Sequence, residues 1–134
     1  MTTRASGSFD VKLTPQATDD SSTAAAIGRL SIDKQFHGDL EATSRGVMLA
    51  AGTGIPNSAG YVALERVSGT LGGFTGSFVL QHSGTMNRGA PQLVVTVVPD
   101  SGTEGLTGLS GTMMIIIAGG KHSYEFDYQF NGPT

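Results

Sequence analysis

The chain ends in a stretch that alternates without a break, HSYEFDYQF at residues 122–130. Side chains two positions apart on an extended strand share a face, so Tyr124, Phe126 and Tyr128 lie on one side and two acids on the other. Glycine, with 20 of 134 residues, is present at roughly twice its usual ~7% share and separates further segments of this kind. This rhythm predicts an all-β protein.

Eight segments have the composition of strands. A polar connection at 17–23 separates the first from the second, and the stretch from residue 24 could open with one helical turn before the second strand. Glycine-bearing turns of hairpin length favour antiparallel pairing between neighbours. Eight strands form either a sandwich or a barrel, and we favour the eight-stranded antiparallel closed barrel because closure leaves no exposed edge. We expect a single domain over 1–134, with its core at about 7–130. The expected strands are 6–15, 27–38, 41–53, 59–71, 76–86, 91–102, 110–120 and 122–130.

Charge and composition exclude several classes of function. The net charge of −3 comes from 11 acidic and 8 basic residues, and no basic cluster suits a phosphate backbone, so nucleic acid is not an expected partner. No apolar run approaches the ~20 residues of a membrane helix, and no secretion signal is evident, so we expect a cytoplasmic location. The chain lacks cysteine and its three histidines lack metal-binding spacing, so neither metal nor other cofactor is expected.

Glu65 is the first candidate for chemistry. It shares a strand face with Tyr61, whereas Arg66 points the other way. If that face lines the lumen, burial would raise the pKa of the Glu65 carboxyl, which could then act as a general base near neutral pH. The alternative, which we favour, is that Glu65 pairs with Arg66 or Lys121 at the rim or at an oligomer contact.

His82 shares an apolar strand face with Phe78 and Leu80, and Gln81 takes the opposite face. A lone histidine on such a face is more often a hydrogen-bonded core residue than a catalyst. We therefore hold the core interpretation ahead of the catalytic one.

The closing strand also leaves two alternatives. In the one we favour, Tyr124, Phe126 and Tyr128 form an aromatic wall of the lumen that carries two hydroxyl groups. In the other, Glu125 and Asp127 lie inside as a binding or proton-transfer pair.

Four stretches carry a resemblance to a known family: SAGYVALERVSGTLGGFTGSFVLQHSGTM, LVVTVVPDSGT, GLSGTM and GKHSYEFDY. The resemblance as a whole runs from about Gly7 to Tyr128. They resemble an uncharacterised bacterial family, a domain of unknown function, whose fold is the allene oxide cyclase-like barrel, lipocalin-like in shape. The resemblance implies the fold but no reaction. By fold analogy, related barrels bind apolar small molecules, and allene oxide cyclase itself cyclises a fatty-acid epoxide inside a trimeric barrel.

The chain departs from the pattern of that family at two positions and in one loop. Val47 stands where an acid is usual, Phe74 stands where a basic residue is common, and the loop with Ile55 and Pro56 is unusual. Such changes would replace charge with apolar surface around one end of the barrel, as in a pocket reshaped for an apolar guest. A laboratory-evolved variant and ordinary divergence would both produce them.

The leading hypothesis is a barrel that binds a small apolar molecule in its lumen. If it is an enzyme, we expect cofactor-free proton transfer, isomerisation or cyclisation. The expected catalytic residues are Glu65 as base and Tyr61 or Tyr124 as hydrogen-bond donor. The expected ligand-binding residues are Val47, Phe74, Phe78, Gln81, His82, Phe126 and Asp127.

The rival hypothesis is a non-catalytic barrel whose lumen is filled by its own side chains and which acts through protein contacts. The segments 91–102 and 110–120 carry apolar residues on both faces, so under either hypothesis we expect a homo-oligomer, a dimer or trimer, that covers the outer face. A void in the lumen would separate the two hypotheses, because a filled barrel has none.

Overall fold

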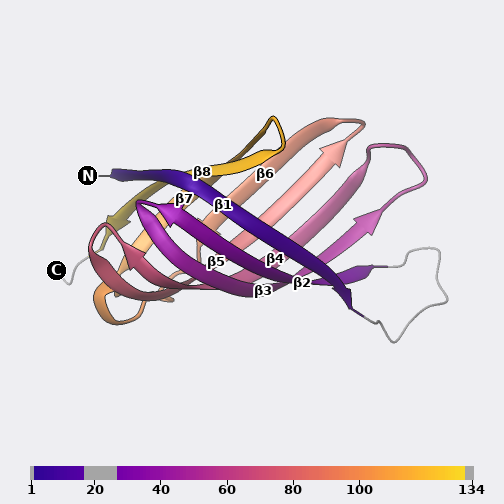
Figure 1. The fold of residues 1–134 in the computed structure, drawn as a ribbon. Helices are drawn as coiled ribbons and strands as arrows, with labels where there is room; N and C mark the ends of the chain where they lie inside the picture. The colour runs from indigo at the N-terminus through magenta and orange to yellow at the C-terminus, as the bar shows by residue number, and fades with distance from the viewer. Residues whose placement is uncertain (1, 17–26, 132–134) are drawn as a thin grey trace.

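The computed structural model describes residues 2–16 and 27–131, which form the closed barrel shown in Figure 1. Neighbours in sequence pair antiparallel and the first strand pairs with the last, so the predicted fold class is confirmed. The expected connection at 17–23 and the helical turn from residue 24 lie outside the described residues. The strands are β1 (Thr3–Gln16), β2 (Gly28–Gly38), β3 (Leu40–Gly52), β4 (Ala59–Leu71), β5 (Phe74–Asn87), β6 (Ala90–Val97), β7 (Leu109–Ala118) and β8 (Lys121–Phe130), with the 3-10 helix η1 (Glu104–Leu106) before β7.

Strand β6 differs most from its expected bounds, because it ends at Val97 and not at residue 102. Strand β1 is also longer than expected. It begins at Thr3, opposite Tyr128 of β8, and continues past Pro15 to Gln16. Proline lacks an N–H group and is therefore tolerated only where a strand can spare one hydrogen bond, such as near its end. By contrast, β4 has the bounds that alternation predicted. Within the described ranges, no helix is long and apolar enough to span a membrane.

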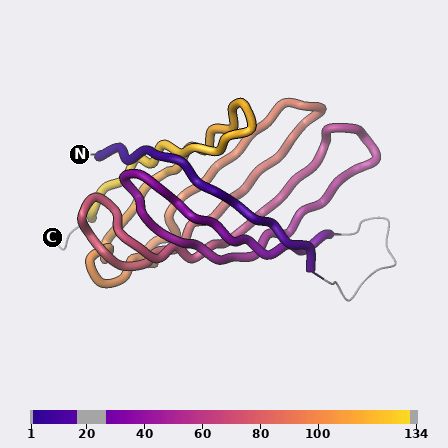
Figure 2. Tube along the Cα trace, in the orientation of Figure 1, coloured from indigo at the N-terminus to yellow at the C-terminus, as the bar shows by residue number. Residues whose placement is uncertain are grey.

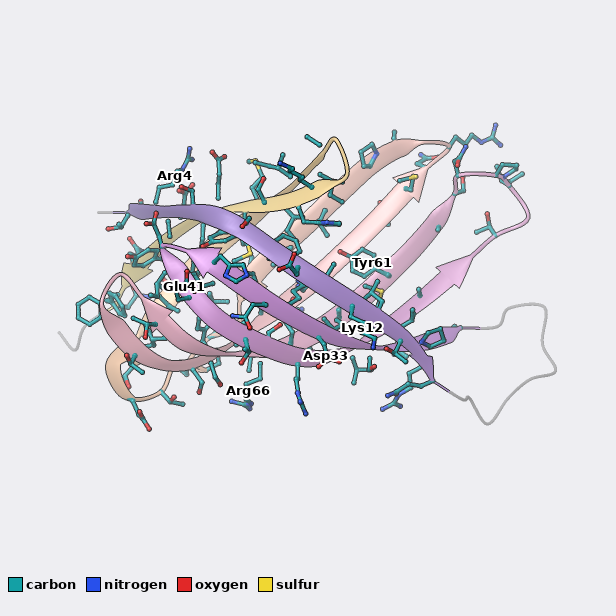
Figure 3. The ribbon with its side chains drawn as sticks, viewed as in Figure 1. Arg4, Lys12, Asp33, Glu41, Tyr61 and Arg66 are labelled. Carbon is teal, nitrogen blue, oxygen red and sulfur yellow. The ribbon has the colours of Figure 1, made fainter. Side chains whose placement is uncertain are left out.

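Alternation along each strand separates the lumen from the outer surface. On β8, Tyr124 and Phe126 are buried, which confirms that the aromatic row faces inward. Asp127 faces outward, where its carboxylate accepts hydrogen bonds of 2.8 and 3.1 Å from the guanidinium of Arg4. Figure 3 shows Arg4 on the outside of the barrel.

Packed aromatic rings fill the lumen at one end, which we call the closed end. The start of β1, the end of β8, the β2–β3 and β4–β5 turns and the β6–β7 loop gather there (Figure 1). The ring of Phe36 meets Tyr124 edge-on at 5.6 Å between centroids, and Phe78 stacks on Phe126 at 5.9 Å. All four rings are at most 1% exposed, so this half of the barrel is a packed core and has no room for a ligand.

The loop between β6 and β7 covers the closed end. Leu106, in the η1 helix of this loop, is fully buried, and Thr103 of the same loop exchanges hydrogen bonds with Ser77 of β5. A Cβ atom at Gly76 would lie 2.2 Å from the Thr103 carbonyl oxygen. Only glycine therefore allows the loop to cross β5 so closely.

At the opposite, open end the wall of the barrel is incompletely paired. The strands run slantwise from one end to the other (Figure 2), as closure of a barrel requires. Most neighbouring strands pair along much of their length, but among the described residues Thr96 and Thr112 are the only registered pair between β6 and β7. Near this seam Leu93 and Ile117 are 40% and 66% exposed.

The hydroxyl of Tyr124 holds the β2–β3 turn: it accepts a hydrogen bond from the Leu40 N–H at 3.0 Å and donates one to the His37 carbonyl at 2.9 Å. Tyr124→Phe leaves both backbone groups without this partner, and we expect it to lower the free energy of unfolding by about 1–3 kcal/mol in urea denaturation. Tyr128→Phe is the matched control on the same strand, because the Tyr128 hydroxyl makes no hydrogen bond within the described ranges. Equal losses in the two variants would contradict this assignment.

Candidate functional site

A buried charged cluster lies inside the barrel, midway along it. The Glu65 carboxylate accepts hydrogen bonds from Lys34 Nζ at 2.7 Å and His82 Nε2 at 2.5 Å, both at Oε2, and from Ser44 Oγ at 2.7 Å, at Oε1. The side chains of Lys34, Glu65 and His82 are 6%, 0% and 4% exposed. We call these four residues the Glu65 cluster.

Four adjacent strands each supply one member of this cluster. On each strand that member has its side chain on the face that points into the barrel. Lys34 lies on β2 directly opposite Ser44 on β3, and Glu65 on β4 lies opposite Gly46. A Cβ atom at Gly46 would come within 2.8 Å of the Glu65 Cβ. The glycine therefore makes room for the carboxylate between the strands.

The cluster keeps Glu65 ionised. Burial alone would raise the pKa of the Glu65 carboxyl. The hydrogen bond from His82 and the positive charge of Lys34 have the larger combined effect and lower this pKa to about 2. The raised pKa expected of a buried general base is therefore wrong for Glu65. The expected partners were also wrong: Arg66 points outward (Figure 3) and Lys121 lies at the β7–β8 turn.

An ionised carboxylate also decides the tautomer of His82. Glu65 Oε2 can only accept, so a neutral imidazole carries its proton on Nε2 and leaves Nδ1 as an acceptor. Nδ1 makes no hydrogen bond within the described part of the chain. Because no buried side-chain nitrogen or oxygen there lacks a hydrogen-bond partner, Nδ1 must be accessible, and His82 lines a cavity.

That cavity occupies the open half of the lumen and has a volume of about 130 Å³. Lys34, Tyr61, His82 and His122 supply its polar groups, and the rest of its lining is apolar. Toward the open end it adjoins a largely apolar hollow of about 410 Å³, with which it shares Met48 and Tyr61. Its apolar lining consists of Phe9, Val11, Leu13, Ile32, Met48 and Ile115.

Three of the predicted site residues meet at this cavity. Glu65 lies behind the cavity wall, and Tyr61 and His82 form part of that wall, with ring centroids 6.3 Å apart. Tyr61 lies inside the barrel between the slanting strands (Figure 3). Burial raises the pKa of the Tyr61 hydroxyl, and the negative charge of Glu65 raises it further. The hydroxyl therefore stays protonated.

Three other residues that the sequence predicted for the site lie in the packed core of the closed end instead. Phe78 and Phe126 stack on each other in the core, and the Tyr124 hydroxyl is engaged with the β2–β3 turn. Tyr124 therefore does not serve as the donor beside Glu65 that the sequence suggested. Its strand face was predicted correctly, but alternation does not say how far along the barrel a side chain lies.

The remaining predicted ligand-binding residues do not line the lumen. Val47, Gln81 and Asp127 take the outward phase of β3, β5 and β8. Phe74 is 50% exposed at the β4–β5 turn and packs on Phe130 with centroids 5.2 Å apart. Val47 and Phe74 thus lie on separate parts of the surface, and the idea that they reshape one end of a pocket was wrong.

Sequence reasoning missed Lys34, Ser44 and Gly46, although one signal was present. Lys34 shares a strand face with Ile32 and Phe36, two apolar residues that are buried in the barrel. A lysine on an inward row needs a buried partner, and this could have pointed to Glu65. Across the described ranges, no group of three or more histidine, cysteine or acidic side chains could hold a metal ion.

The lowered pKa of Glu65 predicts a pH dependence of stability. A carboxyl whose pKa falls from 4.5 unfolded to about 2 folded stabilises the fold above its unfolded pKa, and the contribution is lost as the pH falls through the folded value. We expect Glu65 to account for about 3 kcal/mol of unfolding free energy, lost between about pH 5 and pH 2.

Urea denaturation at several pH values would measure this loss. Glu65→Gln should show a shallower decline in that range, whereas Asp127→Asn, which alters an exposed carboxylate, should keep the Glu65 component. Parallel declines for wild type and Glu65→Gln would refute the assignment.

Comparisons with known proteins show the family to which the chain belongs. The profile of a family described as "Protein of unknown function (DUF3224)" matches residues 5–128. A crystal structure of a protein with unknown function from the DUF3224 family of Shewanella oneidensis MR-1 is 49% identical, with a TM-score of 0.94, and the match covers 99% of this chain and 100% of that chain. None of the curated proteins matches the chain. The chain belongs to the DUF3224 family, whose function is unknown.

Proposed function

We propose that this barrel binds a small, mainly apolar molecule that carries one carbonyl or carboxylate group, in the cavity of its open half. The observation that carries the proposal is an apolar cavity with the Glu65 cluster at its inner end. Any reaction in this cavity would be cofactor-free acid–base chemistry, because the groups present are imidazole, ammonium, phenol and carboxylate. By fold analogy with allene oxide cyclase-like barrels, an apolar guest in the lumen is a reasonable occupant.

The size of the cavity suits a small guest. A cavity of roughly 150 Å³ with apolar walls can hold one benzene molecule, and the cavity here is of about 130 Å³ before the adjoining hollow is counted. A guest somewhat larger than benzene would extend from the cavity into that hollow. The rival hypothesis, a lumen filled throughout, does not account for this space.

Lys34 can recognise an oxygen atom of the guest. An ammonium group has three donors, and Lys34 uses one for Glu65 within the described part of the chain. The ammonium also lies 5.0 and 5.6 Å from the ring centroids of Phe9 and Phe36, which attract a cation. These contacts hold the nitrogen at the cavity wall, where its remaining donors suit a carbonyl or carboxylate oxygen.

Ligand binding can be tested by thermal shift with phenylacetone and phenylacetate. A ligand that binds only the folded chain raises the melting temperature, so we expect an increase that grows with probe concentration. Val11→Phe, which fills the cavity, should abolish this increase. The control Val94→Phe introduces the same ring on the outer face, where Val94 is 50% exposed, and should preserve it.

Two results would contradict this proposal. One is the absence of any shift with either probe up to its solubility limit. The other is an equal shift in wild type and Val11→Phe, which would locate binding outside the cavity.

The expected homo-oligomer stays a prediction, and one outer face suits a second copy of the chain. Val47, Leu49, Val62 and Leu64 of β3 and β4 are 36–53% exposed and line a groove of about 460 Å³. These four side chains carry no charge, and adjacent apolar side chains on an exposed sheet face are typical of an interface.

Light scattering or native mass spectrometry would measure the oligomeric state. If the face packs on a second copy, Leu64→Lys should lower the mass to that of the monomer, because burying an unpaired charge is costly. Thr14→Lys, on an exposed part of β1, should leave the oligomer intact. A wild-type monomer at all concentrations would contradict the prediction.

A further inference from the structure

The strongest unassigned group in the barrel is His82 Nδ1. In its neutral form the imidazole has an acceptor at Nδ1, its Nε2–H is fixed on Glu65 at 2.5 Å, and His82 lines the cavity. A base needs an accessible lone pair, a fixed orientation and a nearby donor for the charge that its action creates. His82 has the first two, and Lys34 and Tyr61 supply the third.

We propose that the cavity catalyses proton transfer at the carbon next to a carbonyl, with His82 as the base and small apolar ketones as the substrate class. This inference rests on the proposed function, since it requires that such a molecule bind in the cavity. It goes beyond binding because it assigns a reaction and gives each member of the site a role.

The reaction is balanced with solvent water as the only further reactant. The lone pair of His82 Nδ1 takes the α-proton, the C–H electron pair forms the C=C bond of the enolate, and the carbonyl π electrons move onto oxygen. The imidazolium can return the proton to another carbon of an extended enolate, which isomerises the substrate. In D₂O it can instead exchange its N–H proton for a solvent deuteron and deliver the deuteron to the original carbon, which exchanges the α-proton. His82 ends as it began.

Two donors can stabilise the enolate oxygen. The Lys34 ammonium has donors to spare, and it contacts the same Glu65 oxygen as His82 does, so base and cation lie beside each other. The Tyr61 ring lies 6.3 Å from that of His82, and its hydroxyl makes no hydrogen bond within the described ranges. Donors fixed around a developing oxyanion are an effective source of rate acceleration.

Glu65 is a positioning residue in this scheme. Its carboxylate already accepts from Lys34, Ser44 and His82 and does not line the cavity. By accepting from Nε2–H, it keeps the Nδ1 lone pair of His82 directed at the cavity and stabilises the imidazolium that forms. Glutamine at this position could donate to Nε2 and so reverse the tautomer.

The test uses phenylacetone in D₂O and follows exchange of its α-protons by ¹H NMR, with the melting-temperature shift by the same probe as a separate measure of binding. We expect wild type to exceed an equal concentration of free imidazole by about 100-fold, the lower range for positioned acid–base catalysis. His82→Gln should lose about 100-fold and Tyr61→Phe about 10-fold, both with the shift retained. His37→Gln, which alters an exposed histidine, is the control and should exchange as wild type does.

A readout of the tautomer separates the positioning role of Glu65 from a merely structural one. In Glu65→Gln the ¹⁵N chemical shifts of His82 should move from the Nε2–H to the Nδ1–H pattern, with loss of exchange in a chain that still melts cooperatively. An unchanged tautomer with lost exchange would overturn this role.

The outcomes distinguish the inference from the proposed function. Binding of phenylacetone without exchange above free imidazole overturns the inference alone, and absence of both binding and exchange overturns both. Exchange that survives in His82→Gln and disappears in His122→Gln, the other histidine of the cavity, would overturn the choice of base. If His82→Gln fails to fold, Tyr61→Phe decides, since undiminished exchange in that variant would overturn the arrangement of donors.

Discussion

The burial of one carboxylate, that of Glu65, determines how the middle of this barrel is built. Removing an ion from water costs several kcal/mol unless it is paired and hydrogen-bonded. Here the cost is offset by three donors, from Lys34, Ser44 and His82. Each donor comes from a different strand, and a slip of one residue in any of them would turn its donor to the outer surface. The carboxylate therefore fixes the register of β2 to β5, and it leaves Gly46 as the residue that fits opposite it.

Stability alone does not account for such a cluster. Replacing a buried ion pair by apolar side chains of similar volume is often neutral or stabilising, and the closed half shows that this chain can fill a lumen with rings such as Phe36, Phe78 and Phe126. The charged cluster lies where this filling stops and the cavity begins. Its position between a rigid core and an open space is the arrangement that holds polar groups in fixed geometry toward a bound molecule.

Much of the fold followed from the sequence, because alternation fixes which face of a strand is buried. It predicted the bounds of β4, the inward aromatic row of β8 and the face that Glu65 shares with Tyr61. Alternation does not show how far along the barrel axis a side chain lies. For this reason Tyr124 was expected beside Glu65, although the Tyr124 hydroxyl lies at the closed end. The partners of Glu65 could be found only from cross-strand register, because Lys34 lies 31 residues away in sequence.

Under the proposed function, the shape of the lumen limits how a guest can lie in the barrel. The Glu65 cluster ends the cavity on the inside, and beyond it the lumen is filled, so the proposed guest would place its polar group innermost and its apolar part toward the open end. There β6 and β7 have no registered pair among the described residues, since Thr96 and Thr112 pair nearer the closed end, and Leu93 and Ile117 line the hollow beside the seam. A proposed guest longer than the cavity would therefore extend along the apolar hollow, so the inner cavity would select for the functional group and the outer hollow would tolerate the rest of the molecule.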